Sequence, residues 1–371
     1  MKTTKKINFY FLLLVLIIIS CSSQEYTTAK LAIQQQDYVK AEEWLPKAMA
    51  VEPDNPEIPI VMAVEIHAKN GDWTKMIELF NKSLVLDSNK VIEVRSSFKS
   101  VKETVNNYKE YYWANEFNSG VEKFKLINND PDNKKKYLNE AISHFENASL
   151  INPNDANTHS TLSKCYFDLG EKDLAKKSAL KSVEVSPESF DANFAAGQIL
   201  LRIGADPNEV LVLYQKAVDI DGSNSKALRE LASIHYDMGN KQLSIQVFKN
   251  AIDNETDKII KADLYYNMGV IHNQMKNHDA AEKAFDEALF LNEDDFEAAL
   301  GMAVSYEGLG DNYMNGTNEF SKNLEKAARW YRKAEKSIKS VMMVDIDNTE
   351  KYKKTLELLR YKREIAETSD S

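Results

Sequence analysis

The chain of 371 residues has only two cysteines, Cys21 and Cys165. Two cysteines cannot build a disulfide framework, and neither stands in the spacing of a zinc ligand set. Cys21 closes an apolar run at the N-terminus, whereas Cys165 lies among apolar neighbours in the sequence LSKCYF. We therefore expect Cys165 to be a small buried hydrophobic residue without a redox or metal-binding role.

Glycine and proline are also scarce, with 12 and 8 copies respectively. No segment alternates apolar and polar residues for more than a few positions, which disfavours an all-β fold. Hydrophobic residues make up 43% of the chain and charged residues 28%, and these values are ordinary for a folded protein. The composition predicts an all-α protein.

The chain lacks an excess of basic residues. Its formal net charge is −10, and it becomes −13 without residues 1–20, which hold Lys2, Lys5 and Lys6 and no acidic residue. Nonspecific binding of nucleic acid depends on a basic face that displaces counterions from phosphates. We therefore expect no nucleic-acid partner.

Motifs for catalysis and cofactor binding are missing from the sequence. There is no Gly-rich phosphate loop, no G-x-S-x-G elbow and no His-Glu-x-x-His metal pair. Three of the six histidines, His67, His235 and His272, recur at equivalent helix positions, and we interpret them as packing residues. The sequence predicts a protein that is not an enzyme and that holds no cofactor or metal.

Residues 1–20 combine a basic start with an uninterrupted apolar run from Phe9 to Ile19. A helix of that length reaches about 16 Å, about half of the hydrocarbon core of a bilayer. The run therefore suits an export signal better than a membrane span. The residues Ile18-Ile19-Ser20-Cys21 resemble the lipobox of bacterial lipoproteins.

This resemblance implies cleavage before Cys21, acylation of that cysteine and anchoring in a bacterial cell envelope. Ser22 follows the cysteine, where some lipoproteins retained in the inner membrane carry Asp. The expected location is therefore the outer membrane, facing the periplasm. A short uncleaved anchor, or a chance cysteine behind an ordinary signal peptide, is the alternative.

One residue pattern recurs eight times between residues 41 and 334. Each copy has a residue near the start of a helix, most often a larger residue four positions later, and a small residue three positions further on. Residues at these spacings share one helical face, so small side chains there let two helix axes approach closely. The first positions are Ala41, Met76, Ala141, Ala175, Val210, Ser244, Ala281 and Ala327, with successive spacings of 35, 65, 34, 35, 34, 37 and 46.

The pattern, its period of 34 or 35 residues, and the pairs Ala196-Gly197 and Met268-Gly269 resemble the tetratricopeptide repeat. The resemblance covers about residues 22–345. It implies an α-α superhelix of about seven or eight helix-turn-helix repeats, closed by a C-terminal capping helix. The expected organisation is a signal peptide (1–20), N-terminal repeats (21–90), a modified repeat (91–153), C-terminal repeats (154–345), and a capping helix with a tail (346–371).

The modified repeat accounts for the spacing of 65 residues. No Gly or Pro occurs from Val91 to Ser119, and apolar residues recur every three or four positions. We predict one elongated first helix over about 91–127, whose apolar stripe packs against the chain's own repeats and does not form an intermolecular coiled coil. Its aromatic segment YKEYYWANEF is a candidate docking surface wherever it is exposed. The stripe consists of Val91, Val94, Phe98, Val101, Val105, Tyr108 and Tyr112.

The resemblance also implies that partners bind a concave face formed by the first helices of the repeats. Aromatic, basic and amide side chains on that face suit an extended peptide or a partner helix. In the alternative interpretation, several of these side chains are solvated or packed under a neighbouring helix. The expected binding residues are Phe194, Gln198, Leu201, Arg229, Tyr236, Tyr266, Asn273 and Glu307.

These expectations combine into one hypothesis of function. The chain is a lipid-anchored, non-enzymatic scaffold or adaptor of the bacterial envelope, whose partners are other envelope proteins or peptide segments. Assembly, secretion and pilus machinery are the settings that the family resemblance implies. The alternative is a glycan- or cell-wall-binding module, in which aromatic side chains of the groove stack on sugar rings.

Overall fold

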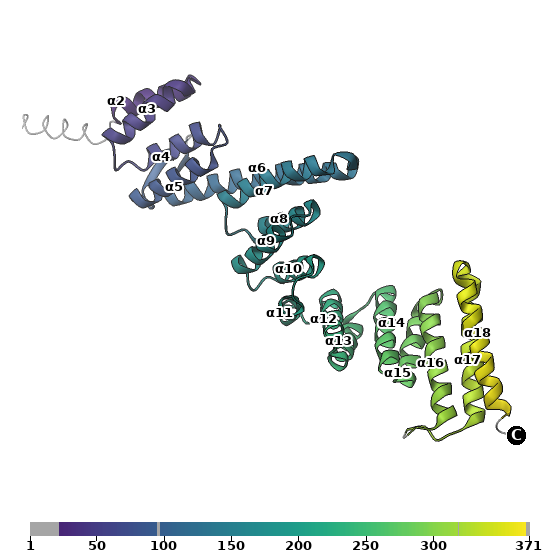
Figure 1. The fold of residues 1–371 in the computed structure, drawn as a ribbon. Coiled ribbons are helices and arrows are strands. Elements are labelled where there is room, and N and C mark those ends of the chain that lie inside the picture. Colours follow the sequence, from purple (N-terminus) through teal and green to yellow (C-terminus); the bar gives the residue numbers. More distant parts are fainter. Residues whose placement is uncertain (1–21, 95–96, 318, 369–371) are drawn as a thin grey trace, which may run out of the picture. The chain divides into compact units, whose positions relative to one another are not determined.

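The computed structural model describes residues 22–94, 97–317 and 319–368, and the predicted signal peptide and Cys21 lie outside these ranges (Figure 1). The chain divides into two compact units, the first ending at Val185 and the second beginning at Ser186. Within the described ranges, the chain is helical apart from one two-stranded sheet. None of the helices in these ranges is both long enough and apolar enough to cross a bilayer.

The first unit consists of four consecutive helix pairs in the described residues (Figure 1). Two short strands precede the third pair, and a 3-10 turn, η3 (Pro131–Asn133), connects its helices. The pairs are α2 (Gln24–Gln34) with α3 (Tyr38–Val51); α4 (Glu57–Met62), continued by the π-helix η2 (Ala63–His67), with α5 (Trp73–Asp87); α6 (Val101–Asn129) with α7 (Lys134–Ile151); and α8 (Ala156–Leu169) with α9 (Lys172–Val185).

The second unit continues with four more pairs and a final helix in the part of the chain that is described. The expected all-α fold of consecutive helix pairs is therefore confirmed, and so is a helix that packs on the last pair. The elements are α10 (Phe190–Ile203) with α11 (Pro207–Ile220), α12 (Ser225–Asp237) with α13 (Lys241–Asn254), α14 (Lys258–Gln274) with α15 (His278–Leu291), α16 (Phe296–Asn315) with α17 (Leu324–Val344), the turn η4 (Ile346–Asn348) and α18 (Thr349–Thr368).

The repeated pattern of the sequence marks the contact between the paired helices. Every residue at its three positions is at most 3% exposed, so small side chains do bring helix axes together while larger ones fill the remaining space. The first positions are given above. The second and third positions are Leu45 and Ala48, Phe80 and Ser83, Phe145 and Ala148, Ala179 and Ser182, Tyr214 and Ala217, Phe248 and Ala251, Phe285 and Ala288, and Tyr331 and Ala334.

Short polar residues and glycines set the ends of several helices. The side chain of Asp37 accepts a hydrogen bond from the backbone N–H of Lys40 at 3.1 Å, and Asp72 caps α5 in the same way. Gly170 and Gly204 follow α8 and α10 with φ angles of 91° and 76°, a conformation that side chains with a Cβ atom disfavour. The turns therefore follow from local sequence.

The expected single helix over 91–127 is wrong for residues 91–94 and 97–100. These residues form an antiparallel hairpin of β1 (Val91–Val94) and β2 (Ser97–Ser100), in which Glu93 lies opposite Phe98. The helix begins at Val101, because the hydroxyl of Ser100 accepts a hydrogen bond from the backbone N–H of Glu103 at 3.2 Å and caps it. The β-branched run VIEV fits a strand as well as a helix, and Ser100 followed by Glu103 is the sequence sign of a helix start.

From Val101 onward, the predicted stripe does pack against the chain itself. Val101 and Val105 are fully buried, and the rings of Tyr108 and Tyr112 lie against the same core. The ring centroid of Tyr108 is 6.3 Å from that of Phe80 in α5. The stripe is therefore internal to the first unit.

The aromatic segment of α6 is mostly committed to packing. The indole N–H of Trp113 donates to the hydroxyl of Thr158 at 3.1 Å, and the ring centroid of Phe117 lies 5.3 Å from that of Phe145. Tyr111 is 59% exposed. The candidate docking surface on this segment is thereby reduced to Tyr111 and the edges of its neighbours.

Candidate functional site

All eight predicted binding residues lie in the second unit, on the first helices of its pairs. On α10, the ring of Phe194 stacks on that of Phe190, with centroids 5.5 Å apart, and also contacts Tyr214. Gln198 is half-buried and Leu201 is 41% exposed. Phe194 is therefore partly a packing residue, whereas Leu201 is available to a partner.

The two predicted residues of α12 both contact neighbouring polar side chains. The guanidinium of Arg229 donates to the carboxylate of Glu230 at 3.1 Å, and the Arg229 side chain is 39% exposed. The hydroxyl of Tyr236 donates to the side-chain oxygen of Gln274 in α14 at 2.5 Å. Neither Arg229 nor Tyr236 is among the residues that line the cleft described next.

A cleft of about 550 Å³ lies over α14 and α16 and brings two of the eight predicted residues together, Tyr266 and Asn273. We call it the C-terminal cleft. Its volume falls in the usual range for ligand sites, about 300–1,000 Å³. Its lining residues are Tyr266, Val270, Asn273 and Gln274 of α14, Phe285 of α15, Phe296, Glu297, Leu300, Gly301 and Val304 of α16, and Asp345, Asn348 and Tyr352 of the C-terminal segment.

Asn273 connects three helices instead of offering its amide to a partner. Its side-chain N–H₂ donates to the carbonyl of Gly301 at 3.0 Å, and its oxygen accepts from the hydroxyl of Ser305 at 3.1 Å. The same oxygen lies 3.1 Å from Nδ1 of His278 in α15. Asn273 therefore holds the wall of the C-terminal cleft in place.

Glu307, the last of the predicted residues, is engaged by the final helix. Its carboxylate lies 2.7 Å from the ammonium of Lys362 in α18, which also contacts Asp311 at 2.9 Å. Half-buried ion pairs of this kind fix neighbouring helices. Glu307 therefore belongs to the attachment of α18 and not to the C-terminal cleft.

The C-terminal cleft is acidic. Glu297 and Asp345 line it, and its lining residues include no Lys or Arg. Hydrogen bonds from the hydroxyl of Tyr352, at 2.5 Å, and from the amide of Asn348 hold the pKa of Asp345 below its usual 3.8, so this carboxyl is ionised at neutral pH. Burial and the charge of Glu297 raise the pKa of Tyr266, which therefore stays neutral. The cleft therefore combines an apolar and aromatic lining with negative charge.

Exposed apolar residues adjoin the C-terminal cleft. Met343, Val344 and Ile346, which flank Asp345 in the chain, are 76%, 63% and 73% exposed. Phe296 and Val304 inside the cleft are 36% and 47% exposed. Exposed apolar residues grouped beside a cleft are typical of protein interaction sites.

Sequence reasoning missed the C-terminal wall. Phe296, Asp345, Asn348 and Tyr352 line the C-terminal cleft, but the segment DIDN at 345–348 reads as a turn before a capping helix. The repeat pattern stops at Ala334, so it carries no information on how the segment beyond it folds back. The one available signal was the apolar run VMMVDI at 341–346, because a solvated turn does not need so many apolar residues.

In the described ranges, no group of three or more His, Cys, Asp or Glu side chains is arranged to hold a metal ion. Nδ1 of His67 lies 3.2 Å from the carboxylate of Asp72, in the turn between η2 and α5. His235 and His272 are half-buried between helices. Their packing positions agree with the structural interpretation of these histidines.

Comparisons with known proteins agree with the repeat pattern. The family model of the tetratricopeptide repeat matches residues 161–225 and 262–295. The type IV pilus assembly protein PilF of Pseudomonas aeruginosa is 25% identical over 140 residues, which cover 37% of this chain and 54% of PilF. The human protein O-mannosyl-transferase TMTC3 is 21% identical over 192 residues, 48% of this chain and 21% of that protein.

The chain thus spans about half the length of PilF and about a fifth of TMTC3. Among solved structures, the C-terminal part of a tetratricopeptide repeat protein of Cytophaga hutchinsonii is similar with a TM-score of 0.47 and 19% identity, covering 70% of this chain and 92% of the other. The repeats recognised at 161–225 and 262–295 contain α9, α11 and α15, whose contacts follow the same pattern as those of the remaining pairs. The chain therefore contains tetratricopeptide repeats at residues 161–225 and 262–295.

Proposed function

We propose that the protein is a non-enzymatic scaffold that binds a segment of a partner protein in the C-terminal cleft. The observation that carries this proposal is the cleft itself, which is lined by apolar residues such as Val270 and Leu300 and by the carboxylates of Glu297 and Asp345. Such a site takes an apolar side chain against the apolar lining and a neighbouring Lys or Arg at the carboxylates. The exposed residues Val344 and Ile346 extend the contact area.

A protein segment fits the C-terminal cleft better than a glycan does. Sugar recognition needs several free polar groups, yet the amide of Asn273 and the carboxylate of Asp345 are already hydrogen-bonded within the chain. Of the aromatic rings in the cleft, Phe285 and Tyr352 are at most 3% exposed and cannot stack on a sugar ring, and Phe296, at 36%, is the most exposed one. Binding of cell-wall material is the alternative that the experiment below tests.

The proposed setting is the bacterial envelope, with the chain anchored through an acylated Cys21. The lipobox supports this, and α2 begins at Gln24, so the tether between anchor and first repeat is very short. A short tether keeps the repeats near membrane partners and raises their local concentration. The similarity to PilF, a pilus assembly protein of Pseudomonas aeruginosa, supports a role in assembling envelope machinery.

Site-specific crosslinking tests the binding site. A photoreactive residue in place of Val304, inside the C-terminal cleft, is compared with one in place of Val212, which is 66% exposed on α11 and outside it. We expect a defined protein partner to be captured from membranes at position 304 and not at 212. Tyr266→Ala should reduce this capture, because Tyr266 lines the cleft, whereas Arg229→Ala should not.

Equal capture at both positions, or capture that is unaffected by Tyr266→Ala in a folded variant, would rule out the C-terminal cleft as the binding site. Retention of the protein on purified cell-wall saccharide, lost in Tyr266→Ala, would favour the alternative. Anchoring is tested separately, by incorporation of labelled fatty acid into the wild type and into Cys21→Ala. Label in both proteins would contradict acylation at Cys21.

A further inference from the structure

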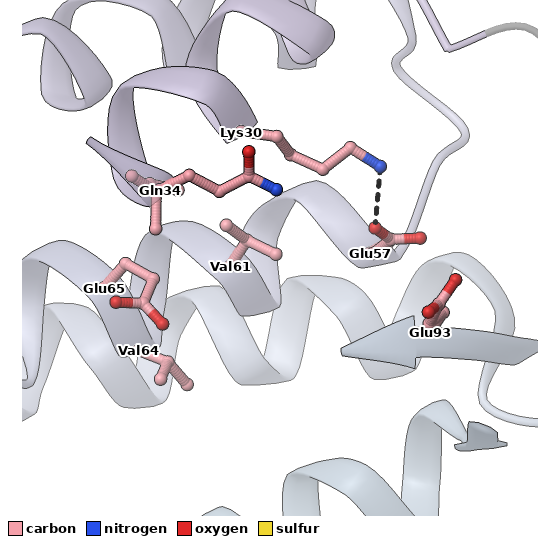
Figure 2. Close-up of a pocket in the computed structure, with 8 residues that line it drawn as sticks. Lys30, Gln34, Glu57, Val61, Val64, Glu65 and Glu93 are labelled. Carbon is pink, nitrogen blue, oxygen red and sulfur yellow. Dashed lines mark hydrogen bonds and ion pairs between the residues drawn. The ribbon is translucent and has the colours of Figure 1, made fainter. Parts of the chain in front are cut away.

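A second, smaller cleft lies in the first unit, between α2, α4, η2 and β1 (Figure 2). We call it the N-terminal cleft. Its floor is aliphatic, with Ile33 from α2, Val61 from α4 and Val64 from η2. Its volume of about 190 Å³ is below the usual range for small-molecule sites, about 300–1,000 Å³. The cleft therefore has room for one or two apolar side chains and not for a free ligand.

Three carboxylates and one ammonium surround this floor. They belong to Glu57, Glu65, Glu93 and Lys30, and Figure 2 shows the contact of Lys30 with Glu57. The Glu57 carboxylate is fixed, since it also accepts a hydrogen bond from the buried hydroxyl of Tyr26 at 2.5 Å. The Glu65 carboxylate lies 2.9 Å from the ammonium of Lys69, so two of the three carboxylates already have a lysine partner. The three carboxylates and the two lysines Lys30 and Lys69 still leave one net negative charge, which favours a partner that brings positive charge.

The hairpin extends the N-terminal cleft into an exposed apolar surface. Glu93 lines the cleft, and Phe98 lies directly opposite it on the neighbouring strand. Paired residues project from the same face of a sheet, and so does Val91, two positions from Glu93. Phe98 and Val91 are 70% and 64% exposed.

The opposite face of the hairpin is anchored in the protein. Ile92 is 3% exposed and lies in the core formed by α5 and α6. The exposed pair Val91 and Phe98 therefore sits on a supported surface. A tetratricopeptide pair consists of helices alone, so this hairpin is an addition to the repeat that serves no packing need on its outer face.

We propose that the first unit holds a second docking surface, for a protein segment that places an aliphatic side chain in the N-terminal cleft. A Lys or Arg beside that side chain contacts the exposed carboxylate of Glu93, and the segment continues across Val91 and Phe98 of the hairpin. The carboxylates disfavour an anionic lipid surface as the occupant. With one docking surface in each unit, the scaffold holds two partner segments at once.

A difference selection tests this proposal. Peptides that bind the double variant Glu93→Lys, Phe98→Ser are first removed from a phage-displayed library of random peptides. The remaining peptides are then selected for binding to the full-length wild-type protein. The selected peptides should carry an aliphatic residue next to Lys or Arg. Both substituted side chains lie at the surface, so the variant folds, and an unchanged thermal unfolding curve verifies this.

The affinity of one selected peptide is then measured against single variants. Glu93→Lys should weaken binding on the order of tenfold, because it places like charges together, and Phe98→Ser should weaken it about fivefold or more. Matched surface changes elsewhere in the unit, Glu42→Lys on α3 and Val85→Ser on α5, should leave it unchanged, since both side chains are exposed away from the N-terminal cleft.

The outcome is independent of the C-terminal cleft, so Tyr266→Ala should bind the selected peptide as the wild type does. Three results would overturn the proposal: a library without peptides that distinguish wild type from the double variant, selected peptides without a basic residue, or self-association of the protein that Phe98→Ser abolishes. The last result would identify a second copy as the occupant of this surface.

Discussion

The ring of Phe285 in α15 occupies the space that a side chain on Gly301 in α16 would need. A Cβ atom on Gly301 would lie 2.4 Å from Cζ of this ring, and a Cβ atom on Gly269 in α14 would lie 2.9 Å from Cε1. Phe285 is fully buried. Three helices of two successive repeats therefore meet at one aromatic ring, which also forms part of the C-terminal cleft.

Gly301→Ala should destabilise the protein by about 1–3 kcal/mol, because the buried ring has to move to admit the methyl group. Alanine favours a helix over glycine by up to about 1 kcal/mol, which offsets part of this loss. The free energy of unfolding from denaturant titration measures the change. Gly222→Ala is the control, since its Cβ atom would meet only the carbonyl oxygen of Val218 at 3.5 Å; an equal loss in both variants would contradict the steric explanation.

The sequence was sufficient to predict the contacts around Phe285. Ala281, Phe285 and Ala288 share one helical face because of their spacing alone, and all three are buried. This spacing is a local property, and eight copies of it remove the ambiguity of any single one. The burial of Cys165, predicted from its apolar neighbours in the sequence, is confirmed as well.

The structure adds what the sequence could not show where a distant part of the chain contacts a predicted residue. Asn273 and Glu307 occupy groove positions in the repeat, but their side chains are engaged by Gly301 and Lys362, which lie 28 and 55 positions away in the sequence. No local pattern reports such partners. The helix predicted for residues 91–94 and 97–100 was wrong for a different reason. β-Branched residues at helical spacing are also compatible with a strand.

Lys362 ties the final helix to the last repeat pair. Its ammonium donates to Glu307 at 2.7 Å and to Asp311 at 2.9 Å. Burial opposes the charge, but these hydrogen bonds outweigh it and raise the pKa of Lys362 above 10.5. The ion pair therefore stabilises the folded protein fully below pH 10.5, and this contribution is lost as the pH rises above that value.

Lys362→Met should lower the free energy of unfolding by about 1–2 kcal/mol, because two carboxylates lose their partner. Urea titration measures this loss, and protease cleavage within α18 should become faster. Lys353→Met removes a solvated pair with Glu350 on the same helix and should have no measurable effect. Equal resistance of α18 to protease in wild type and Lys362→Met would show that the ion pair does not hold this helix.

The thiol of Cys165 is fully buried, and burial, together with the charge of Asp168, raises its pKa from 9.0 to about 12. The neutral thiol contributes stability at neutral pH, which is lost as the pH rises through 9.0. In Cys21→Ala, Cys165 should react with a thiol reagent at least about a hundredfold more slowly than in denaturant, because reaction requires unfolding. Absorbance of the released thiolate measures the rate, and fast labelling of the native protein would contradict this burial.

His235 on α12 and His272 on α14 share an unusual feature. In each, Nδ1 is buried and has no hydrogen-bond partner within the described residues. Burial lowers the pKa of both side chains below the ordinary value of 6.5, with the charge of Lys249 adding to the effect at His272. In the unfolded chain these histidines take up a proton more readily than in the folded protein.

The stability that the two neutral histidines contribute should therefore be fully present above pH 6.5. It should fall as the pH decreases through that value, because the unfolded state then binds more protons than the folded state. The double variant His235→Gln, His272→Gln should lose less stability than the wild type between neutral pH and about 5.5. Denaturant titrations at several pH values measure the slope. Carboxyl groups with a lowered pKa, such as Asp345, titrate below this range and do not obscure it.

His159→Gln is the control for this experiment. Nε2 of His159 lies 2.9 Å from the carbonyl oxygen of Pro153, so this ring already has a hydrogen-bond partner. Its replacement makes the same histidine-to-glutamine change in the first unit, on α8, and reports how such a change alone affects the overall stability. If the double variant keeps the full wild-type slope of stability against pH, the buried Nδ1 atoms of His235 and His272 do not govern the response to acid. His278, the third histidine of the second unit, then becomes the next residue to replace.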